Sequence, residues 1–428
     1  AKAGLALSGS LNRVSGFDRK HYSHPDLPKG YQVTQDVAPL ARGGELELSS
    51  GRRVPLTGIH LEEDAGKSRH EAKATLVDLN RAGVPLIEVV TEPVLRSGAE
   101  VQDFLTRLRE ELRFAGISDG DMERGSLRCD VNVSLAPRGT DGFARVELKN
   151  LNSIRAAGAA VADEFERQHR LLEELTAGTG PGPTDETRRW DADAGRSEPM
   201  RAKEAAVDYR FLPEPDLPEL ELPAREAATR REGSPSAEGP LALRRRWTAE
   251  HGLDPADGVA LCGSRALAEH LEACVAAGAP AVAAAKWLLN EPDPALAHGA
   301  PPDVIPRLAP AVLAELLQLV EDGAVSSATA RDLAPRLAAA ADEARASGGR
   351  VPGPRALVAA LGLATLTDEG ELASAVHRAL DARPDAVASF LAGRAQALEV
   401  LVGQVMAATR GRADAAVVRR LLTARLED

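Results

Sequence analysis

The hydrophobic periodicity of this 428-residue chain changes once, at a proline-rich stretch over residues 213–223. Before this stretch, apolar and polar residues alternate over 86–92, 127–134 and 145–150, which is the pattern of strands with one buried face. After it, apolar residues recur at i, i+3, i+4 and i+7, as they do over 313–320, which indicates amphipathic helices. The sequence therefore predicts an α+β fold in the first half and an all-helical second half.

Helical segments are also predicted between the strands of the first half. Ser97 and Glu100 form a capping box before an apolar run that Gly116 ends, and a longer helix is expected from about 153 to 176. A second stretch rich in glycine and proline, over 348–354, separates the last part of the chain. We expect three domains, which are an α+β domain over 1–222, a helical domain over 223–348 and a small helical tail over 349–428.

Composition and charge limit the classes of protein to which the chain can belong. Hydrophobic residues make up 44% and charged residues 27%, as in ordinary globular proteins, and no apolar run reaches the ~18 residues of a membrane span. The net charge of -12 argues against a protein that coats nucleic acid through a basic surface. Three dispersed cysteines without a C-x-x-C pair argue against a disulfide framework, and no secretory leader is visible. We expect a cytoplasmic protein without membrane contact.

Lysine is rare in this chain and unevenly placed. Eight of the 52 basic residues are lysines, and seven of the eight precede Glu204. Because the chain uses arginine at most basic positions, the few positions that hold lysine are predicted to need a compact ammonium on a flexible stem. Ordinary surface lysines are the alternative.

Acidic residues of the first half gather beside apolar residues at strand ends and turns, in 60–67, 86–93, 123–130 and 147–150. Carboxylates from several strands of one sheet can converge on Mg²⁺, which usually serves phosphate chemistry. Paired surface ions on an amphipathic sheet are the alternative, because no single run is a specific motif. His60 is predicted to be a strand histidine with one hydrogen-bond partner and not a ligand.

The common signatures of nucleotide and nucleophile sites are missing from the sequence. It contains no G-x-x-x-x-G-K-[ST] loop, no strand-associated G-x-G-x-x-G and no G-x-S-x-G elbow. An ATP site in this chain would therefore not be of the Walker or Rossmann type.

Short motifs follow one another in a specific order along the chain. They include Phe-Asp-Arg-Lys at 17–20, Pro-Asp-Leu-Pro-Lys-Gly-Tyr-Gln at 25–32, the runs 60–67, 78–81, 125–130 and 147–153, and then 186–189, 200–204, 208–210 and 401–406. This ordered series resembles the B subunit (GatB family) of the glutamine-dependent aspartyl/glutamyl-tRNA amidotransferases. The resemblance covers nearly the whole chain. The family's initial strand, with its Gly-Leu-Glu-Val-His motif whose Glu and His face the metal, has no counterpart in residues 1–428.

The resemblance implies an enzyme that corrects mischarged tRNA. In this family, ATP phosphorylates the side-chain carboxylate of Glu on tRNA(Gln) or of Asp on tRNA(Asn), and ammonia displaces the phosphate. The ammonia comes from a partner amidase (glutaminase), and a small third protein completes the heterotrimer. The chemistry is consistent, since a carboxylate becomes a good electrophile only when phosphorylation supplies a leaving group. The resemblance further implies a cradle-shaped mixed-sheet catalytic domain related to glutamine synthetase.

The resemblance also assigns roles to individual residues. Glu63 and Glu88 would bind Mg²⁺, with Glu62 as a neighbouring candidate. Lys29 would pair with Glu63 at the mouth of an ammonia tunnel, where burial shifts the pKa values of both groups. These three residues, Lys29, Glu63 and Glu88, are the catalytic candidates.

Further candidates rest on pattern more than on family motifs. The polar strand faces of Arg128, Asp130, Asn132, Glu147 and Lys149 are predicted to line the pocket for ATP and the acyl group. Over 410–425 there are five arginines and one acidic residue, Asp414, and a contact with the tRNA backbone is predicted for Arg410, Arg412, Arg419, Arg420 and Arg425. A solvated helix end is the alternative for the tail. For the whole chain, the alternatives are a non-catalytic tRNA-binding scaffold and an ATP-dependent carboxylate-amine ligase that acts on a small molecule.

Overall fold

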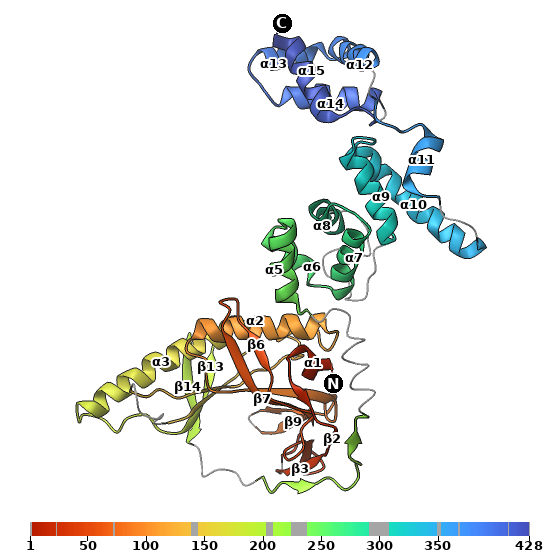
Figure 1. The fold of residues 1–428 in the computed structure, drawn as a ribbon. Coiled ribbons are helices and arrows are strands. Elements are labelled where there is room, and N and C mark those ends of the chain that lie inside the picture. Colours follow the sequence, from red (N-terminus) through yellow and green to blue (C-terminus); the bar gives the residue numbers. More distant parts are fainter. Residues whose placement is uncertain are drawn as a thin grey trace. The chain divides into compact units, whose positions relative to one another are not determined.

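The computed structural model describes residues 2–22, 24–71, 73–137, 144–202, 209–223, 238–290, 308–348, 352–366, 369–409 and 411–427. The chain divides into two compact units, Ala1–Leu243 and Arg244–Asp428. The first unit mixes strands and helices, and the second is helical in its described residues, so the predicted α+β class with a helical carboxyl-terminal region is confirmed (Figure 1).

The described residues of the first unit form two larger sheets, one three-stranded sheet and two strand pairs. One sheet has the order β1-β5-β7-β10, with β6 also paired to β7, and the other has the order β11-β12-β13-β14. Their strands are β1 (Ser10–Leu11), β5 (Ala41–Arg42), β6 (Glu45–Glu47), β7 (Arg53–Glu63), β10 (Pro85–Thr91), β11 (Val131–Val133), β12 (Val146–Lys149), β13 (Glu186–Asp191) and β14 (Arg196–Ala202). A three-stranded sheet has the order β15-β3-β4, and two strand pairs are β16-β2 and β8-β9. These strands are β2 (Val14–Ser15), β3 (Asp18–His21), β4 (Tyr31–Thr34), β8 (Lys67–His70), β9 (Thr75–Asp78), β15 (Leu212–Pro213) and β16 (Leu220–Glu221).

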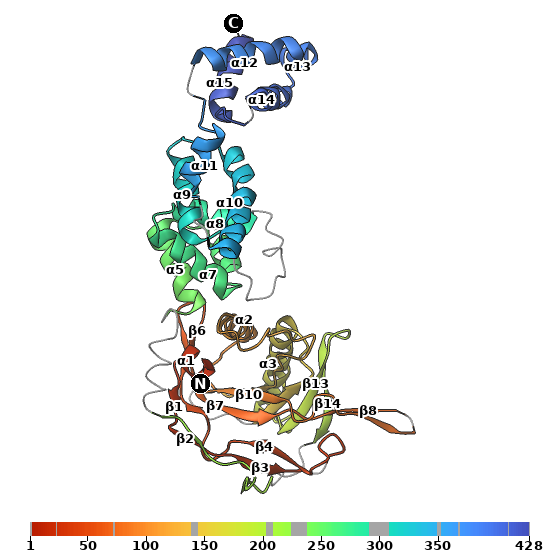
Figure 2. The ribbon, with the colours of Figure 1, turned by 90° about the vertical axis from the view of Figure 1, so that its right-hand side faces the viewer.

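Two long helices, α2 (Gly98–Phe114) and α3 (Ile154–Thr176), cover one side of these sheets, and a short helix α1 (Lys2–Ala6) opens the unit (Figure 2). The Ser97 side chain accepts a hydrogen bond from the Glu100 N–H, which caps α2 as the sequence predicted. The apolar stripe of α2, including Phe104 and Leu108, joins a single core with residues of β7 and β12. This core holds the two sheets in place behind their polar faces.

Glycine allows α2 and α3 to approach closely. A Cβ atom on Gly98 would lie 2.2 Å from the Gly158 carbonyl oxygen, which is far inside contact distance. A side chain at this crossing would therefore separate the helices, because backbone cannot move aside as a flexible side chain can.

The predicted strands over 86–92 and 145–150 are confirmed as β10 and β12. The strand predicted over 127–134 is shorter in the structure, because β11 pairs with β12 only from Val131 to Val133. The side chains of 127–134 nevertheless alternate between more buried and more exposed positions, as predicted. Periodicity thus reported which side chains face the core, but not where the hydrogen-bonded ladder ends.

The second unit contains helices throughout its described residues. They are α5 (Pro240–His251), which begins in the first unit, α6 (Pro255–Leu261), α7 (Arg265–Ala276), α8 (Ala281–Asn290), α9 (Pro310–Glu321), α10 (Ser327–Ser347), α11 (Pro354–Leu361), α12 (Glu369–Ala382), α13 (Pro384–Leu391), α14 (Ala397–Ala408) and α15 (Ala415–Glu427). Leu401, Val405 and Leu422 belong to a separate apolar cluster in the tail. The tail is tied to the preceding helices, because Ser326 Oγ donates to the Gly411 carbonyl at 2.5 Å. Every helix in the described ranges falls short of what a membrane span requires in length or apolar character.

Candidate functional site

Three possible metal ligands meet on the antiparallel pair β7 and β10. Period-2 alternation places His60 and Glu62 on one face of β7, and the register sets Glu88 of β10 opposite His60. His60 Nε2 lies 2.8 Å from Glu88 Oε2 and 3.8 Å from Glu62 Oε1. One ligand atom from each residue lies within 4.8 Å of the others, a spacing that allows all three to bind one cation.

The three groups influence one another's protonation. Burial lowers the pKa of His60, but the hydrogen bond and charge of Glu88 and the charge of Glu62 outweigh it and raise that pKa overall. Burial raises the pKa of Glu62, in part offset by a hydrogen bond from Thr34. The hydrogen bond from His60 lowers the pKa of Glu88 against its own burial. Cation binding here would compete with protonation of His60, because an imidazole ligand must be neutral.

Glu63 lies outside this group. It follows Glu62 directly on β7, and neighbouring residues of a strand point to opposite faces. Its carboxylate forms an ion pair with Lys29 and accepts a hydrogen bond from the Val33 N–H at 2.8 Å. The Glu63 side chain is 13% exposed but the Lys29 side chain is 43% exposed, so the predicted burial is wrong for Lys29. The Lys29 ammonium lies 4.8 Å from the centre of the Tyr31 ring. The structure therefore brings Lys29 to Glu63, as predicted. The glutamate of β7 that lies beside Glu88 is Glu62 and not Glu63. Metal binding by Glu63 stays an untested prediction.

A buried aspartate positions Arg128 beside this region. Asp64, only 2% exposed, accepts two hydrogen bonds from the Arg128 guanidinium at 2.9 and 3.0 Å and a third from Arg81 at 2.9 Å. Such forked, charge-assisted contacts fix the plane of an arginine side chain. Sequence reasoning did not single out Asp64 or Arg81, because burial of a carboxylate within an acidic run is visible only after folding.

The other predicted pocket residues share the polar face of the sheet β11-β12-β13-β14. Asn132 of β11 lies opposite Glu147 of β12, and the Lys149 ammonium bonds to Asp130 at 2.9 Å and to Glu147 at 3.1 Å. Burial lowers the pKa of Lys149, but its bonds with Asp130 and Glu147 outweigh this and raise it. Asp130, Asn132, Glu147 and Lys149 thus form one connected polar surface, whereas their contact with ATP or an acyl group remains a prediction.

The predicted tail arginines do not share one environment. Arg412 donates to the Thr409 carbonyl at 3.3 Å, while Arg419 makes two bonds to Glu399 at 2.9 and 3.1 Å. Arg420 and Arg425 are exposed, and neither has an ion-pair partner among the residues that the structure describes. Arg410 lies outside the described residues.

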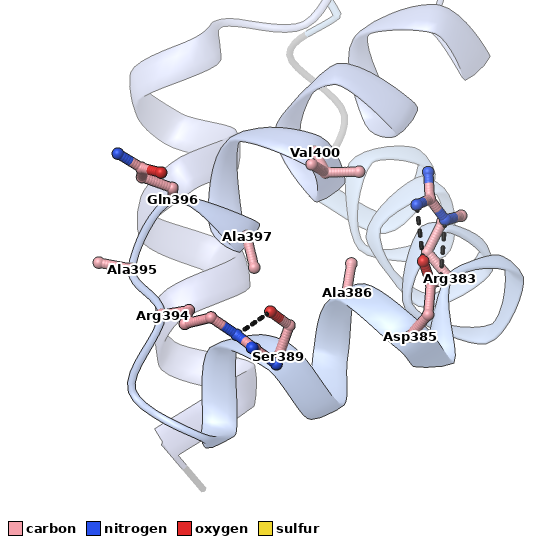
Figure 3. A pocket seen from close by; sticks show the side chains of 9 residues that line it. All are labelled: Arg383, Asp385, Ala386, Ser389, Arg394, Ala395, Gln396, Ala397 and Val400. Carbon is pink, nitrogen blue, oxygen red and sulfur yellow. Dashed lines mark hydrogen bonds and ion pairs between the residues drawn. The ribbon is translucent and has the colours of Figure 1, made fainter.

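A separate hollow of about 650 Å³ opens in the tail between α13 and α14 (Figure 3). Its charged pair, Arg383 and Asp385, is joined by two bonds at 2.9 and 2.8 Å. None of the predicted tRNA-contacting arginines lines this hollow.

His60 was not among the ligand candidates predicted from the sequence. As predicted, it lies in a strand and bonds one partner at 2.8 Å, but it also stands within the group of possible ligands. The spacing His60-x-Glu62 was the available signal, since alternate residues of a strand share a face.

Comparison with known proteins covers both units. Residues 1–227 match the GatB/GatE catalytic domain, and residues 269–426 match the GatB domain. The B subunit of the aspartyl/glutamyl-tRNA(Asn/Gln) amidotransferase of Thermosynechococcus vestitus is 40% identical over 446 residues, covering 99% of this chain and 85% of that protein. The protein of the same name from Synechococcus elongatus is 39% identical over 448 residues, with 100% and 86% covered. The chain therefore belongs to the family formed by the B subunits of the aspartyl/glutamyl-tRNA(Asn/Gln) amidotransferases.

Proposed function

We propose that this chain is the amide-forming subunit of a tRNA-dependent amidotransferase, a ligase that acts on Glu-tRNA(Gln), Asp-tRNA(Asn) or both. ATP transfers its terminal phosphoryl group to an oxygen of the amino acid's side-chain carboxylate, and ADP leaves. Ammonia then attacks the carbonyl carbon, the bond to the phosphate oxygen breaks, and phosphate departs while the nitrogen loses a proton. The full-length match to relatives of that name supports this reaction over a small-molecule ligase or a passive scaffold.

The observation that carries the proposal is the convergence of His60, Glu62 and Glu88 within 4.8 Å. Two carboxylates and an imidazole fit a divalent cation, and oxygen-rich sets of this kind suit Mg²⁺ in phosphate chemistry. Mg²⁺, when bound, would neutralise charge that develops on the transferred phosphoryl group. Thr34 Oγ1 donates to Glu62 at 2.6 Å and Gln32 Nε2 donates to it at 3.2 Å, so this carboxylate is held in place without the cation.

Lys29 and Glu63 are proposed to handle ammonia on the other face of β7. Their contact lets a proton move between an ammonium and a carboxylate; the Glu63 side chain is 13% exposed, whereas water reaches the pair at the Lys29 side chain, which is 43% exposed. Glu63 is suited to take the proton that the attacking nitrogen loses, because a carboxylate within hydrogen-bond reach can act as a general base.

The remaining assignments are proposals of the same kind. Arg128 and the polar surface of Asp130, Asn132, Glu147 and Lys149 would bind ATP and the acyl group. The amidase (glutaminase) of the complex would supply ammonia, and the small third protein would complete the heterotrimer. The complex would act in the cytoplasm, and the arginines of the tail would contact tRNA. We propose that the chain has three domains. They are a cradle-shaped catalytic domain related to glutamine synthetase over 1–222, a helical domain over 223–348 and a tail over 349–428.

The test is an ATP-dependent transamidation assay on both mischarged tRNAs, with the partner amidase added. Glu62→Gln and Glu88→Gln should each abolish tRNA-dependent ATP cleavage, because each removes a charged ligand at the phosphoryl-transfer centre. Glu45→Gln is a matched control, since Glu45 pairs with Arg53 on the same sheet at 2.6 Å but lies outside the cluster. Normal ATP cleavage by both cluster variants would contradict the metal assignment, and no amide product from either tRNA with the wild-type chain would contradict the function.

A further inference from the structure

Lys20 belongs to the Phe-Asp-Arg-Lys motif but has no role in the site described so far. It lies in β3, and the antiparallel register sets it opposite Gln32 of β4. Cross-strand partners share a face of a sheet, and the Gln32 side chain on that face donates to Glu62 at 3.2 Å. Thr34, two residues further along β4, also donates to Glu62. Lys20 therefore stands on the side of the β3-β4 pair that faces the carboxylate cluster.

The ammonium of Lys20 is held by an aromatic ring and not by an acid. Its Nζ lies 4.9 Å from the centre of the Tyr209 ring, a cation–π contact that fixes a cation without using its N–H donors. Tyr209 is itself anchored beside β3, because its carbonyl accepts a hydrogen bond from the His21 N–H at 2.8 Å. Among the residues that the structure describes, Lys20 donates no hydrogen bond within 3.5 Å and forms no ion pair within 4.0 Å, although its charge acts on Glu62 and Glu88.

Two other lysines of this unit show the contrast. Lys29 also lies over a tyrosine ring, at 4.8 Å, but its charge is paired with Glu63. Lys149 is paired with Asp130 at 2.9 Å and Glu147 at 3.1 Å. Within the described part of the chain, Lys20 alone of these three keeps its donors free, although it faces the acidic residues of the cluster.

The Lys20 ammonium is half-buried, has three free N–H donors and lies next to a cluster suited to a divalent cation. Such an ammonium can bind the negatively charged oxygens of a phosphate group. Lysine serves as a point charge for phosphate oxygens, and phosphoryl transfer relies on such cations around the transferred group. We propose that Lys20 binds the terminal phosphate of ATP at this site, an assignment that rests on the proposed function. Tyr209 holds the ammonium in place for that contact. RNA phosphates share the same chemistry, but the neighbouring cluster favours the nucleotide.

The test compares Lys20→Met with the wild-type full chain and with Lys2→Met, a control at an exposed lysine of α1. Dissociation constants are measured for the magnesium complexes of a non-hydrolysable ATP analogue, ADP and AMP. Loss of one charge-assisted contact should weaken the ATP analogue about 10- to 100-fold in Lys20→Met, with ADP and AMP changed less than about twofold. Lys20→Arg, which keeps the charge, should recover part of this loss, and it also serves if Lys20→Met does not fold.

Each alternative result has a defined meaning. Equal affinity of wild type and Lys20→Met for the ATP analogue, or equal weakening of all three nucleotides, would overturn the assignment of Lys20 alone. Unchanged nucleotide binding with weaker binding of charged tRNA across a salt series would assign Lys20 to RNA and likewise overturn it. Failure of the wild-type chain to bind any of the nucleotides would overturn the proposed function together with this assignment.

Discussion

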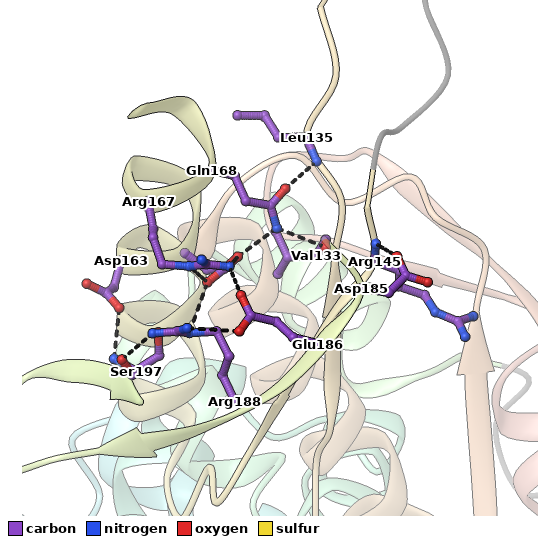
Figure 4. Close-up of polar contacts among 11 residues, drawn as sticks. Val133, Leu135, Arg145, Asp163, Arg167, Gln168, Asp185, Glu186, Arg188 and Ser197 are labelled. Carbon is purple, nitrogen blue, oxygen red and sulfur yellow. Dashed lines mark hydrogen bonds and ion pairs between the residues drawn. The ribbon is translucent and has the colours of Figure 1, made fainter. Parts of the chain in front are cut away.

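Glu164→Ala removes a carboxylate that is 0% exposed in the middle of α3. Glu164 accepts two hydrogen bonds from Arg167 at 2.8 Å each and one from Gln168 at 2.7 Å. The Nε atom of Arg188 lies 3.7 Å from the Glu164 carboxylate. Arg167 and Arg188 both also approach Glu186 (Figure 4). The substitution therefore leaves two mostly buried guanidinium groups with one carboxylate fewer.

The magnitude follows from which partners remain. Removing one member of a buried ion pair costs about 3–5 kcal/mol when the other charge is left without compensation. Here Arg167 keeps Glu186 at 2.6 Å, while Arg188 keeps Glu186 at 3.2 Å and the Ser197 carbonyl at 2.7 Å. These remaining contacts place the expected loss at the low end of that range, about 3 kcal/mol.

The loss should reach the candidate site through β11. Gln168, itself 0% exposed, accepts a hydrogen bond from the Leu135 N–H at 2.8 Å and donates to the Val133 carbonyl at 3.2 Å. Asn132 lies on the strand that these two bonds hold. Loss of the carboxylate frees Gln168 to turn, so the backbone around 131–135 should open more often.

Hydrogen exchange of backbone amides in the full chain measures this directly. A loss of about 3 kcal/mol should speed exchange in α3 and β11 about 100-fold. Glu174→Ala is the control, because Glu174 is exposed on the same helix. Equal protection of both segments in the two variants would refute the idea that the buried network stabilises this unit.

Three further predictions concern pH, ammonia and RNA. Burial and the charge of the neighbouring Glu110 raise the pKa of Glu111 to about 7, so the folded state keeps a proton that the unfolded state loses near 4.5. The free energy of unfolding should therefore fall as pH rises between these values. In urea unfolding, Glu111→Gln should be more stable than wild type above pH 7 and equally stable below pH 4.5. Lys29→Met should spare glutamine hydrolysis by the partner amidase but uncouple it from amide formation; normal glutamine-driven amide yield would refute gating. Arg420→Ala and Arg425→Ala should each reduce the slope of log tRNA affinity against log salt concentration by ~0.7–0.9. Arg419→Ala should reduce this slope less, because Arg419 is already paired with Glu399. An unchanged slope in the Arg420 and Arg425 variants would leave the tail with a structural role only.

Local patterns predicted the elements of the fold better than their pairing. Capping by Ser97 and the apolar spacing after it predicted α2, and alternation predicted the strands β10 and β12 and the buried face of β12. Strands of two residues, such as β1 and β5, carry no periodic signal because alternation needs a longer run. The sequence also could not show that Glu88 lies opposite His60, since that register depends on how two separate strands meet.

Consecutive glutamates on β7 show why the site needed the structure. A run of Glu62, Glu63 and Asp64 reads as one acidic motif, yet the strand sends Glu62 to the His60 cluster and Glu63 to Lys29, while Asp64 is buried against arginine. Three neighbouring acids thus serve three different groups: alternation along the strand separates Glu62 from Glu63, and Asp64 lies one residue beyond the end of β7. Under the proposed mechanism, Glu62 and Glu63 would act on phosphoryl transfer and on ammonia respectively. Substitutions at these adjacent positions should therefore affect different steps, which a resemblance between short motifs could not have separated.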